Sequence, residues 1–257
     1  KGIQMKKQTP FLKVCSFGVV VMACMWSRSQ LFADDVILHT STKLQTPQNA
    51  TRGDDTLDAG NISIWIPGEV KVLRGAIVNP FNIKQVERKD YYEVAGSWQF
   101  AIIGANFFGV MDSDYDALLK AMKEFAERSG HKEIEHLPMV LGSFSAGSGM
   151  LMKMAAMWPD RIIACAPVGL EVGPTTTEAR KIPTITIFGQ KDMRQMKILT
   201  ENLPQQRQQG ALWAIAVNWG LRHEYANAND LVWPFLRPGY PPFTQRTSSV
   251  GQPFVPQ

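Results

Sequence analysis

Residues 139–149 read MVLGSFSAGSG, and this stretch decides the fold that we predict for the chain. A short apolar run leads into Ser145, which has a small residue two places before it and a glycine two places after it. This pattern is typical of a sharp turn from a strand into a helix, where the two backbones lie so close that only small side chains fit. Ser143 stands where a glycine is usual. Because such a turn exposes the serine hydroxyl, we predict that Ser145 is a nucleophile.

Apolar runs on both sides of this turn predict strands that alternate with helices. One helix is expected from about residue 112 to Gly130, and another follows Ser145 and closes at Pro159. The predicted strands are residues 62–66, 75–78, 98–104, 139–141, 162–166, 184–188 and 212–217. Near-continuous apolar strands separated by helices are typical of a mostly parallel sheet covered by helices on both faces. We therefore predict an α/β fold class.

Two residues that could activate a serine follow two of these strands. The strand at 184–188 runs into Asp192, and the strand at 212–217 runs into His223. The carboxyl ends of parallel strands meet at one edge of a sheet, so both side chains are expected near Ser145. A serine nucleophile needs an imidazole to accept its proton and a carboxylate to orient that imidazole. We predict that Ser145, Asp192 and His223 form a catalytic triad.

From about Ile62 to Leu236 the chain resembles the α/β-hydrolase superfamily, in which the triad residues follow one another in this same order. It is most similar to secreted bacterial esterases of the polyhydroxybutyrate depolymerase and feruloyl esterase groups. The loop at 188–192 (FGQKD) resembles the acid loop of the family, and the loop at 220–224 (GLRHE) resembles its histidine loop. Only 46 residues separate Ser145 from Asp192. We therefore expect no large cap and an open site.

The same resemblance implies an oxyanion hole made of two backbone amides. One is the N–H of Ala146, directly after the nucleophile, and the other comes from the loop that follows Val78. Pro80 has no N–H, so the resemblance leaves Phe81 or Asn82 as the second donor.

Other titratable residues compete for these roles. Glu171 follows a predicted strand and is the alternative acid, while His39 lies in a polar segment and is less suited than His223 to act as a base. The segment 131–136 (HKEIEH) clusters two histidines with two acids, but it lacks the HExxH spacing and is interpreted as a solvated turn. No P-loop or dinucleotide-binding glycine pattern occurs. We expect neither a metal nor a cofactor.

Residues 1–33 are predicted to be a secretory signal peptide, with Met5 as the expected start of translation. Basic residues precede an apolar stretch at 14–26, and Leu31-Phe32-Ala33 precedes the expected cleavage position. The alternatives are a short membrane anchor that is never cleaved and a lipid anchor on Cys24. Residues 34–60 are expected to be a polar lead-in, 61–237 the hydrolase domain, and 238–257 a Pro-rich, disordered tail.

Charge and cysteine content change once residues 1–33 are set aside. That segment carries five basic residues and no acidic one, so the formal charge falls from +4 to about −1 without it. Nothing then favours nucleic acid or an anionic membrane surface as a partner. Cys165 becomes the only cysteine, which excludes an internal disulfide in the mature chain. We expect an exported protein, periplasmic or extracellular.

Together these features predict an exported serine hydrolase that cleaves carboxylic esters through an acyl-enzyme. The expected substrate is a small-molecule or polymer-borne ester. Two alternatives remain from the residues alone. The same triad serves hydrolases of other bonds, such as peptidases, and a non-catalytic binding protein can keep the same fold.

Overall fold

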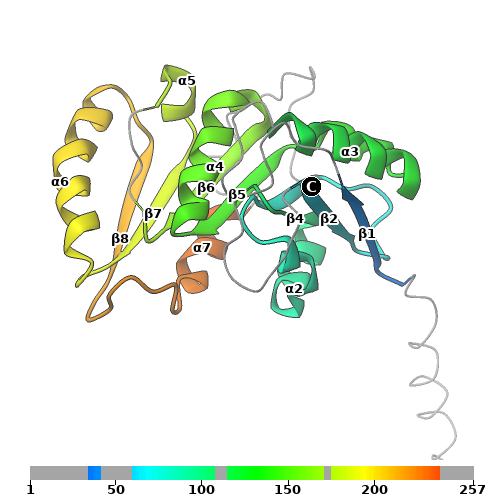
Figure 1. The fold of residues 1–257 in the computed structure, drawn as a ribbon, viewed down its shortest axis with the longest axis horizontal. Helices are drawn as coiled ribbons and strands as arrows, with labels where there is room; N and C mark the ends of the chain where they lie inside the picture. The colour runs from blue at the N-terminus through cyan, green and yellow to red at the C-terminus, as the bar shows by residue number, and fades with distance from the viewer. Residues whose placement is uncertain (1–33, 42–59, 108–114, 171–174, 238–257) are drawn as a thin grey trace, which may run out of the picture. The chain divides into compact units, whose positions relative to one another are not determined.

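The structure is a computed structural model that describes residues 34–41, 60–107, 115–170 and 175–237. In this part of the chain, eight strands form one sheet in the order β1-β2-β4-β3-β5-β6-β7-β8 (Figure 1). The strands are β1 (Val36–Ser41), β2 (Asn61–Ile66), β3 (Gly75–Asn79), β4 (Phe100–Ala105), β5 (Met139–Phe144), β6 (Ile162–Val168), β7 (Thr184–Gly189) and β8 (Trp213–Asn218).

The sheet is parallel from β4 to β8 in its spatial order and antiparallel at the other edge. β2 pairs antiparallel with both β1 and β4, whereas every pair from β4 through β8 is parallel. Parallel strands need crossover connections, and helices supply them. The helices are η1 (Ile83–Glu87), α2 (Lys89–Trp98), α3 (Asp116–Ser129), η3 (Lys132–His136), α4 (Ala146–Met157), η4 (Pro159–Arg161), α5 (Thr177–Arg180), α6 (Met193–Gln208) and α7 (Asn229–Leu236).

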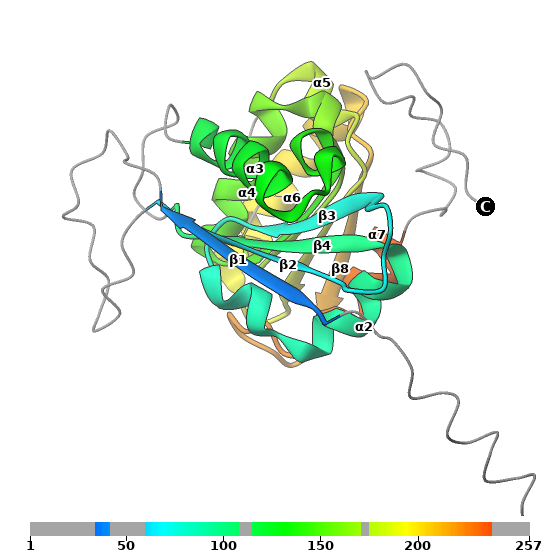
Figure 2. The same cartoon turned by 90° about the vertical axis from the view of Figure 1, so that its right-hand side faces the viewer.

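Helices cover both faces of the sheet, and each face has its own apolar core. The isoleucines of β2 at positions 62, 64 and 66 face the core that α3 and α4 complete, while Trp65 faces the core that α2 and α7 complete. The two views place α3 and α4 on one side of the sheet and α2 and α7 on the other (Figures 1 and 2). The predicted fold class, a mostly parallel sheet covered on both faces, is confirmed.

Two boundaries predicted from the sequence are wrong. The lead-in at 34–60 was expected to lie outside the domain, but Val36–Ser41 forms β1 and pairs along its whole length with β2 (Figure 2). It is an edge strand in which four of the six residues are exposed, and its second half, His39-Thr40-Ser41, is polar. The run from Trp98 was expected to be a strand, yet Trp98 ends α2 and the strand begins at Phe100.

Several of the predictions concern residues outside these ranges. The signal peptide at 1–33 with Cys24, the start of the helix at 112–114 and the tail at 238–257 all lie outside the described residues. Within the described ranges, no helix is both long and apolar enough to cross a membrane. Cys165 is buried in β6 and is not part of a disulfide.

Candidate active site

Ser145 lies at the junction of β5 and α4, in the turn that the sequence predicts. Its backbone has φ 53° and ψ −123°, a conformation that a residue with a side chain rarely adopts. Holding a serine in such a conformation costs on the order of 1–3 kcal/mol, and surrounding contacts must offset this cost. One such contact is the hydrogen bond from the Ser145 N–H to the Val168 carbonyl at 2.8 Å.

The small residues around Ser145 pack directly against each other. A Cβ added to Gly147 would collide with the hydroxyl of Ser143 and would lie 2.6 Å from Cβ of Phe81. Position 147 therefore accepts only glycine in this turn. Ser143 fits because its side chain ends at the space that Gly147 leaves open.

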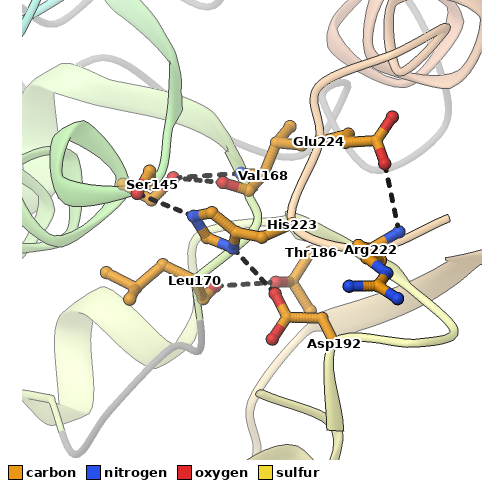
Figure 3. Close-up of polar contacts among 9 residues, drawn as sticks. Ser145, Val168, Leu170, Thr186, Asp192, Arg222, His223 and Glu224 are labelled. Carbon is orange, nitrogen blue, oxygen red and sulfur yellow. Dashed lines mark hydrogen bonds and ion pairs between the residues drawn. The ribbon is translucent and has the colours of Figure 1, made fainter. Parts of the chain in front are cut away.

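The imidazole of His223 lies between Ser145 and Asp192 (Figure 3). Its Nε2 is 2.8 Å from Oγ of Ser145, and its Nδ1 is 2.7 Å from Oδ2 of Asp192. A carboxylate can only accept, so Nδ1 carries the proton and Nε2 is left to accept the hydrogen bond of the serine hydroxyl. The structure thus brings together the three residues that the sequence places at three different strand ends.

His223 and Asp192 differ in their exposure to solvent. The side chain of His223 is 42% exposed and that of Asp192 is 11% exposed. Solvent and substrate can therefore reach the imidazole, while the carboxylate behind it is largely shielded. The two loops that hold them are joined by hydrogen bonds from the Gln190 N–H to the Asn218 carbonyl at 2.9 Å and from the Lys191 N–H to the Leu221 carbonyl at 2.7 Å.

Aromatic rings form one wall beside the imidazole. The Phe144 ring lies 5.0 Å from that of His223, and the Tyr225 ring meets Phe144 edge-on at 6.0 Å. The Tyr225 hydroxyl donates to Oδ1 of Asn229 at 2.6 Å. Burial raises the pKa of Tyr225, so the phenol stays protonated at neutral pH and its role is packing rather than proton transfer.

The three predicted oxyanion donors have different surroundings. Ala146 is the first residue of α4, so its N–H has no carbonyl one turn earlier in the helix to bind. The Phe81 N–H already donates to Oδ1 of Asn79 at 3.0 Å. Asn82 caps η1 with its side chain, which accepts from the Lys84 N–H at 3.0 Å. Asn79 therefore binds the N–H of Phe81 but not the N–H of Asn82.

Two residues that the sequence analysis did not single out hold this region together. The buried hydroxyl of Ser148 lies 3.0 Å from the Ser143 carbonyl and accepts the Val168 N–H at 3.0 Å, so it joins the turn to the end of β6. Asn79, the last residue of β3, accepts from both Phe81 and the Ser143 hydroxyl. The sequence signal that could have pointed to Asn79 is its position, because it is a polar residue at the end of an otherwise apolar strand.

The histidines that compete with His223 for the role of base make their contacts elsewhere. His39 contacts the Ser63 hydroxyl at 2.6 Å, and His131 pairs with Glu133 at 2.9 Å. Glu171, the alternative acid, lies outside the described residues. The described ranges contain no group of three or more histidine, cysteine or acidic side chains that could hold a metal ion.

Comparison with known proteins supports the architecture. No family model matches the chain, and no curated protein matches it in sequence. Among solved structures, a ferulic acid esterase has a TM-score of 0.54 at 10% identity, covering 79% of this chain and 97% of its own. A mutant of the feruloyl esterase module from Clostridium thermocellum, complexed with sinapinate, has a TM-score of 0.52 at 8% identity, covering 79% and 87%.

A cold-adapted esterase from an Arctic intertidal metagenomic library gives a TM-score of 0.51 at 12% identity, covering 79% of this chain and 94% of its own. The chain has the α/β-hydrolase fold. At such low identities the likeness establishes the fold alone. Within the α/β-hydrolase fold of this chain, Ser145, Asp192 and His223 each follow the carboxyl end of a parallel strand: β5, β7 and β8 respectively.

Proposed function

We propose that this chain is an exported serine hydrolase that cleaves carboxylic esters. The observation that carries the proposal is the continuous series of contacts from Ser145 Oγ to His223 Nε2 at 2.8 Å and from His223 Nδ1 to Asp192 Oδ2 at 2.7 Å. Both distances lie within hydrogen-bond range, which a nucleophile and its base require before proton transfer.

In the first half of the reaction, Ser145 Oγ attacks the ester carbonyl carbon and its proton passes to Nε2 of His223. Asp192 keeps the imidazole in the correct tautomer and stabilises the imidazolium that forms. The alcohol oxygen then leaves with that proton, which produces an acyl-enzyme on Ser145. In the second half, His223 accepts a proton from water as the water oxygen attacks the acyl carbon. The bond between that carbon and Ser145 Oγ then breaks, Oγ takes the proton back from His223, and the acid is released.

The tetrahedral intermediate of each half carries a negative oxygen that needs hydrogen-bond donors. We assign the Ala146 N–H and an amide of the loop at 81–82 to this role. Each such donor contributes ~3–4 kcal/mol to transition-state stabilisation in serine hydrolases. The Ala146 amide is suited to it because it belongs to the first turn of α4, where backbone N–H groups lack helical partners.

The accessible imidazole favours small-molecule or polymer-borne esters over substrates that require a buried tunnel. The similar solved structures are named esterases, so an ester is the first substrate class to test. We also propose that residues 1–33 direct export. The intact mass of the protein recovered outside the cytoplasm tests this proposal, because cleavage after Ala33 and lipidation at Cys24 give different masses.

The central test is covalent labelling of the purified full chain with a fluorophosphonate. Attack by Ser145 Oγ forms an O–P bond, breaks the P–F bond, releases fluoride and passes the serine proton to His223. We expect one adduct, located on Ser145 by peptide mass spectrometry, together with p-nitrophenyl acetate turnover. Both should be lost in Ser145→Ala and His223→Ala.

Each alternative result has a defined meaning. A folded parent that neither labels nor turns over any ester contradicts the proposal and favours a binding protein on the same fold. A parent that labels at Ser145 but cleaves only peptides retains the mechanism and replaces the substrate class.

A further inference from the structure

Asn79 connects two parts of the candidate site that are far apart in sequence. Its Oδ1 accepts the Phe81 N–H at 3.0 Å and the Ser143 hydroxyl at 3.0 Å. Its Nδ2 donates to Oε1 of Gln85 at 3.3 Å. A carboxamide oxygen has two lone pairs, so these two donors saturate it and fix which way the amide faces. One side chain therefore joins the loop after β3 to the strand that ends at Ser145.

The two side chains that hydrogen-bond this carboxamide are poorly exposed. Ser143 is 5% exposed and Gln85 is 3% exposed. A buried hydroxyl or amide that loses its partner has no water to replace it, so the network resists rearrangement. The Ser143 side chain also meets Gly147, and Phe81 meets Gly147 from the other loop. The loop after β3 and the first turn of α4 are thus packed against each other and tied by Asn79.

We propose that Asn79 is a positioning residue that, through Ser143, fixes the spacing between the Ala146 N–H and the loop amide that bind the oxyanion. This inference rests on the proposed function. It also assigns a purpose to Ser143, which stands where a glycine is usual: glycine has no hydroxyl to offer Asn79.

We expect the loss of Asn79 to weaken the stabilisation of charged, tetrahedral species and to leave the binding of the planar ester nearly unchanged. Donors placed for the oxyanion stabilise the transition state more than the planar ester, so displacing one donor lowers kcat and leaves KM nearly unchanged. A boronic acid that forms a tetrahedral adduct on Ser145 needs the same donors. Its inhibition constant should therefore rise together with the loss in kcat, which a general loss of folding does not produce.

The experiment compares Asn79→Ala, Ser143→Ala, the double variant and Thr176→Ala in the full chain. We expect Asn79→Ala to lower kcat for p-nitrophenyl acetate ~30-fold with KM within threefold, and to raise the inhibition constant of phenylboronic acid by a similar factor. Ser143→Ala should lower kcat ~5-fold. The double variant should resemble Asn79→Ala, because residues of one network are not additive.

Thr176→Ala is the control, since like Ser143→Ala it removes one side-chain hydrogen bond, here from the Ala179 N–H at the start of α5. It should keep the parent kcat and inhibition constant. A folded Asn79→Ala variant with kcat within twofold of the parent overturns the inference. If Asn79→Ala does not fold, Ser143→Ala decides, and unchanged kcat and boronate inhibition then overturn it. A parent that fails to label at Ser145 instead overturns the proposed function.

Discussion

Gly169 lies against the imidazole of His223, so that a Cβ built on Gly169 would be 3.1 Å from Cε1 of that ring. The same Cβ would be 2.7 Å from the Phe144 ring, and Gly169 has φ +69°. Gly169 directly follows β6 and donates its N–H to the Ile187 carbonyl at 2.8 Å. The imidazole therefore occupies space that a side chain at position 169 would narrow.

Gly169→Ala tests this contact. The added methyl group would meet two rings and a backbone conformation that alanine rarely adopts, so we expect the imidazole to shift and kcat to fall at least ~10-fold, with a stability loss of about 1–2 kcal/mol. Kinetics and urea unfolding measure the two effects. Gly210→Ala is the control, because Gly210 has φ +86° but open space around its Cβ position. Equal kcat in the two variants would contradict the positioning role.

Asp192→Asn tests the orienting carboxylate. The change keeps the size of the side chain but removes its charge, so both the tautomer and the imidazolium lose their stabilisation. We expect kcat to fall ~10³–10⁴-fold at neutral pH while the midpoint of thermal unfolding changes little. Asp160→Asn makes the same chemical change at an exposed position in η4 and should leave kcat unaltered. Retention of more than a tenth of the activity in Asp192→Asn would refute the assignment.

Ser148→Ala tests how much the buried Ser148 hydroxyl, which contacts the Ser143 carbonyl of β5 and the Val168 N–H of β6, contributes to stability. Removing it leaves the Val168 N–H without its hydrogen-bond acceptor in the interior, so the free energy of unfolding should fall by ~1–3 kcal/mol. Ser97, exposed in α2, donates to the Val94 carbonyl at 2.8 Å. Ser97→Ala should change stability by less than ~0.5 kcal/mol. Urea denaturation distinguishes the two, and equal stability losses would contradict the account.

Glu133 is expected to make stability depend on pH. Burial opposes ionisation of this carboxyl, but hydrogen bonds from the Leu73 N–H at 2.8 Å and from His131 outweigh it, so its pKa lies below the ordinary 4.5. A lowered folded-state pKa adds stability above the unfolded-state value, and that stability is lost as the pH falls through the folded-state value.

Glu133→Gln should therefore cost ~1 kcal/mol at pH 7, and the difference from the parent should shrink as the pH falls below 4.5. Urea unfolding at a series of pH values measures it. Glu127→Gln, on the exposed face of α3, is the control and should show no such difference. A cost for Glu133→Gln that stays constant down to acidic pH would count against this explanation.

The central strands and the three strand-end residues could be predicted because their signals are local. Each apolar run lies within or overlaps the strand it predicts, and the turn at Ser145 depends on residues within two positions of it. The helix α2 lacked such signals. Arg88 gives it no side-chain cap, and it ends at Gln99 with φ 59°, a left-handed position where glycine is usual.

Features that depend on residues far apart in the sequence could not be predicted from such local patterns. In Val36–Ser41 only the first three residues are apolar, and it is the pairing of the whole segment with β2 that makes it a strand. Likewise, the contact of Asn79 with Ser143 spans 64 positions and depends on β3 and β5 being neighbours in the sheet. The Phe81 N–H donates to the Asn79 side chain only two positions away, but the sequence alone does not say that this side chain turns back to accept it, so the choice between Phe81 and Asn82 was open.

The direction of β1 decides how the domain would be presented to its surroundings. β1 runs the same way as the parallel strands, because it is antiparallel to β2 and β2 is antiparallel to β4. Val36 therefore lies at the end of the sheet opposite to the strand ends that carry Ser145 and His223. The chain therefore enters the domain at the end of the sheet that lies away from the candidate catalytic residues.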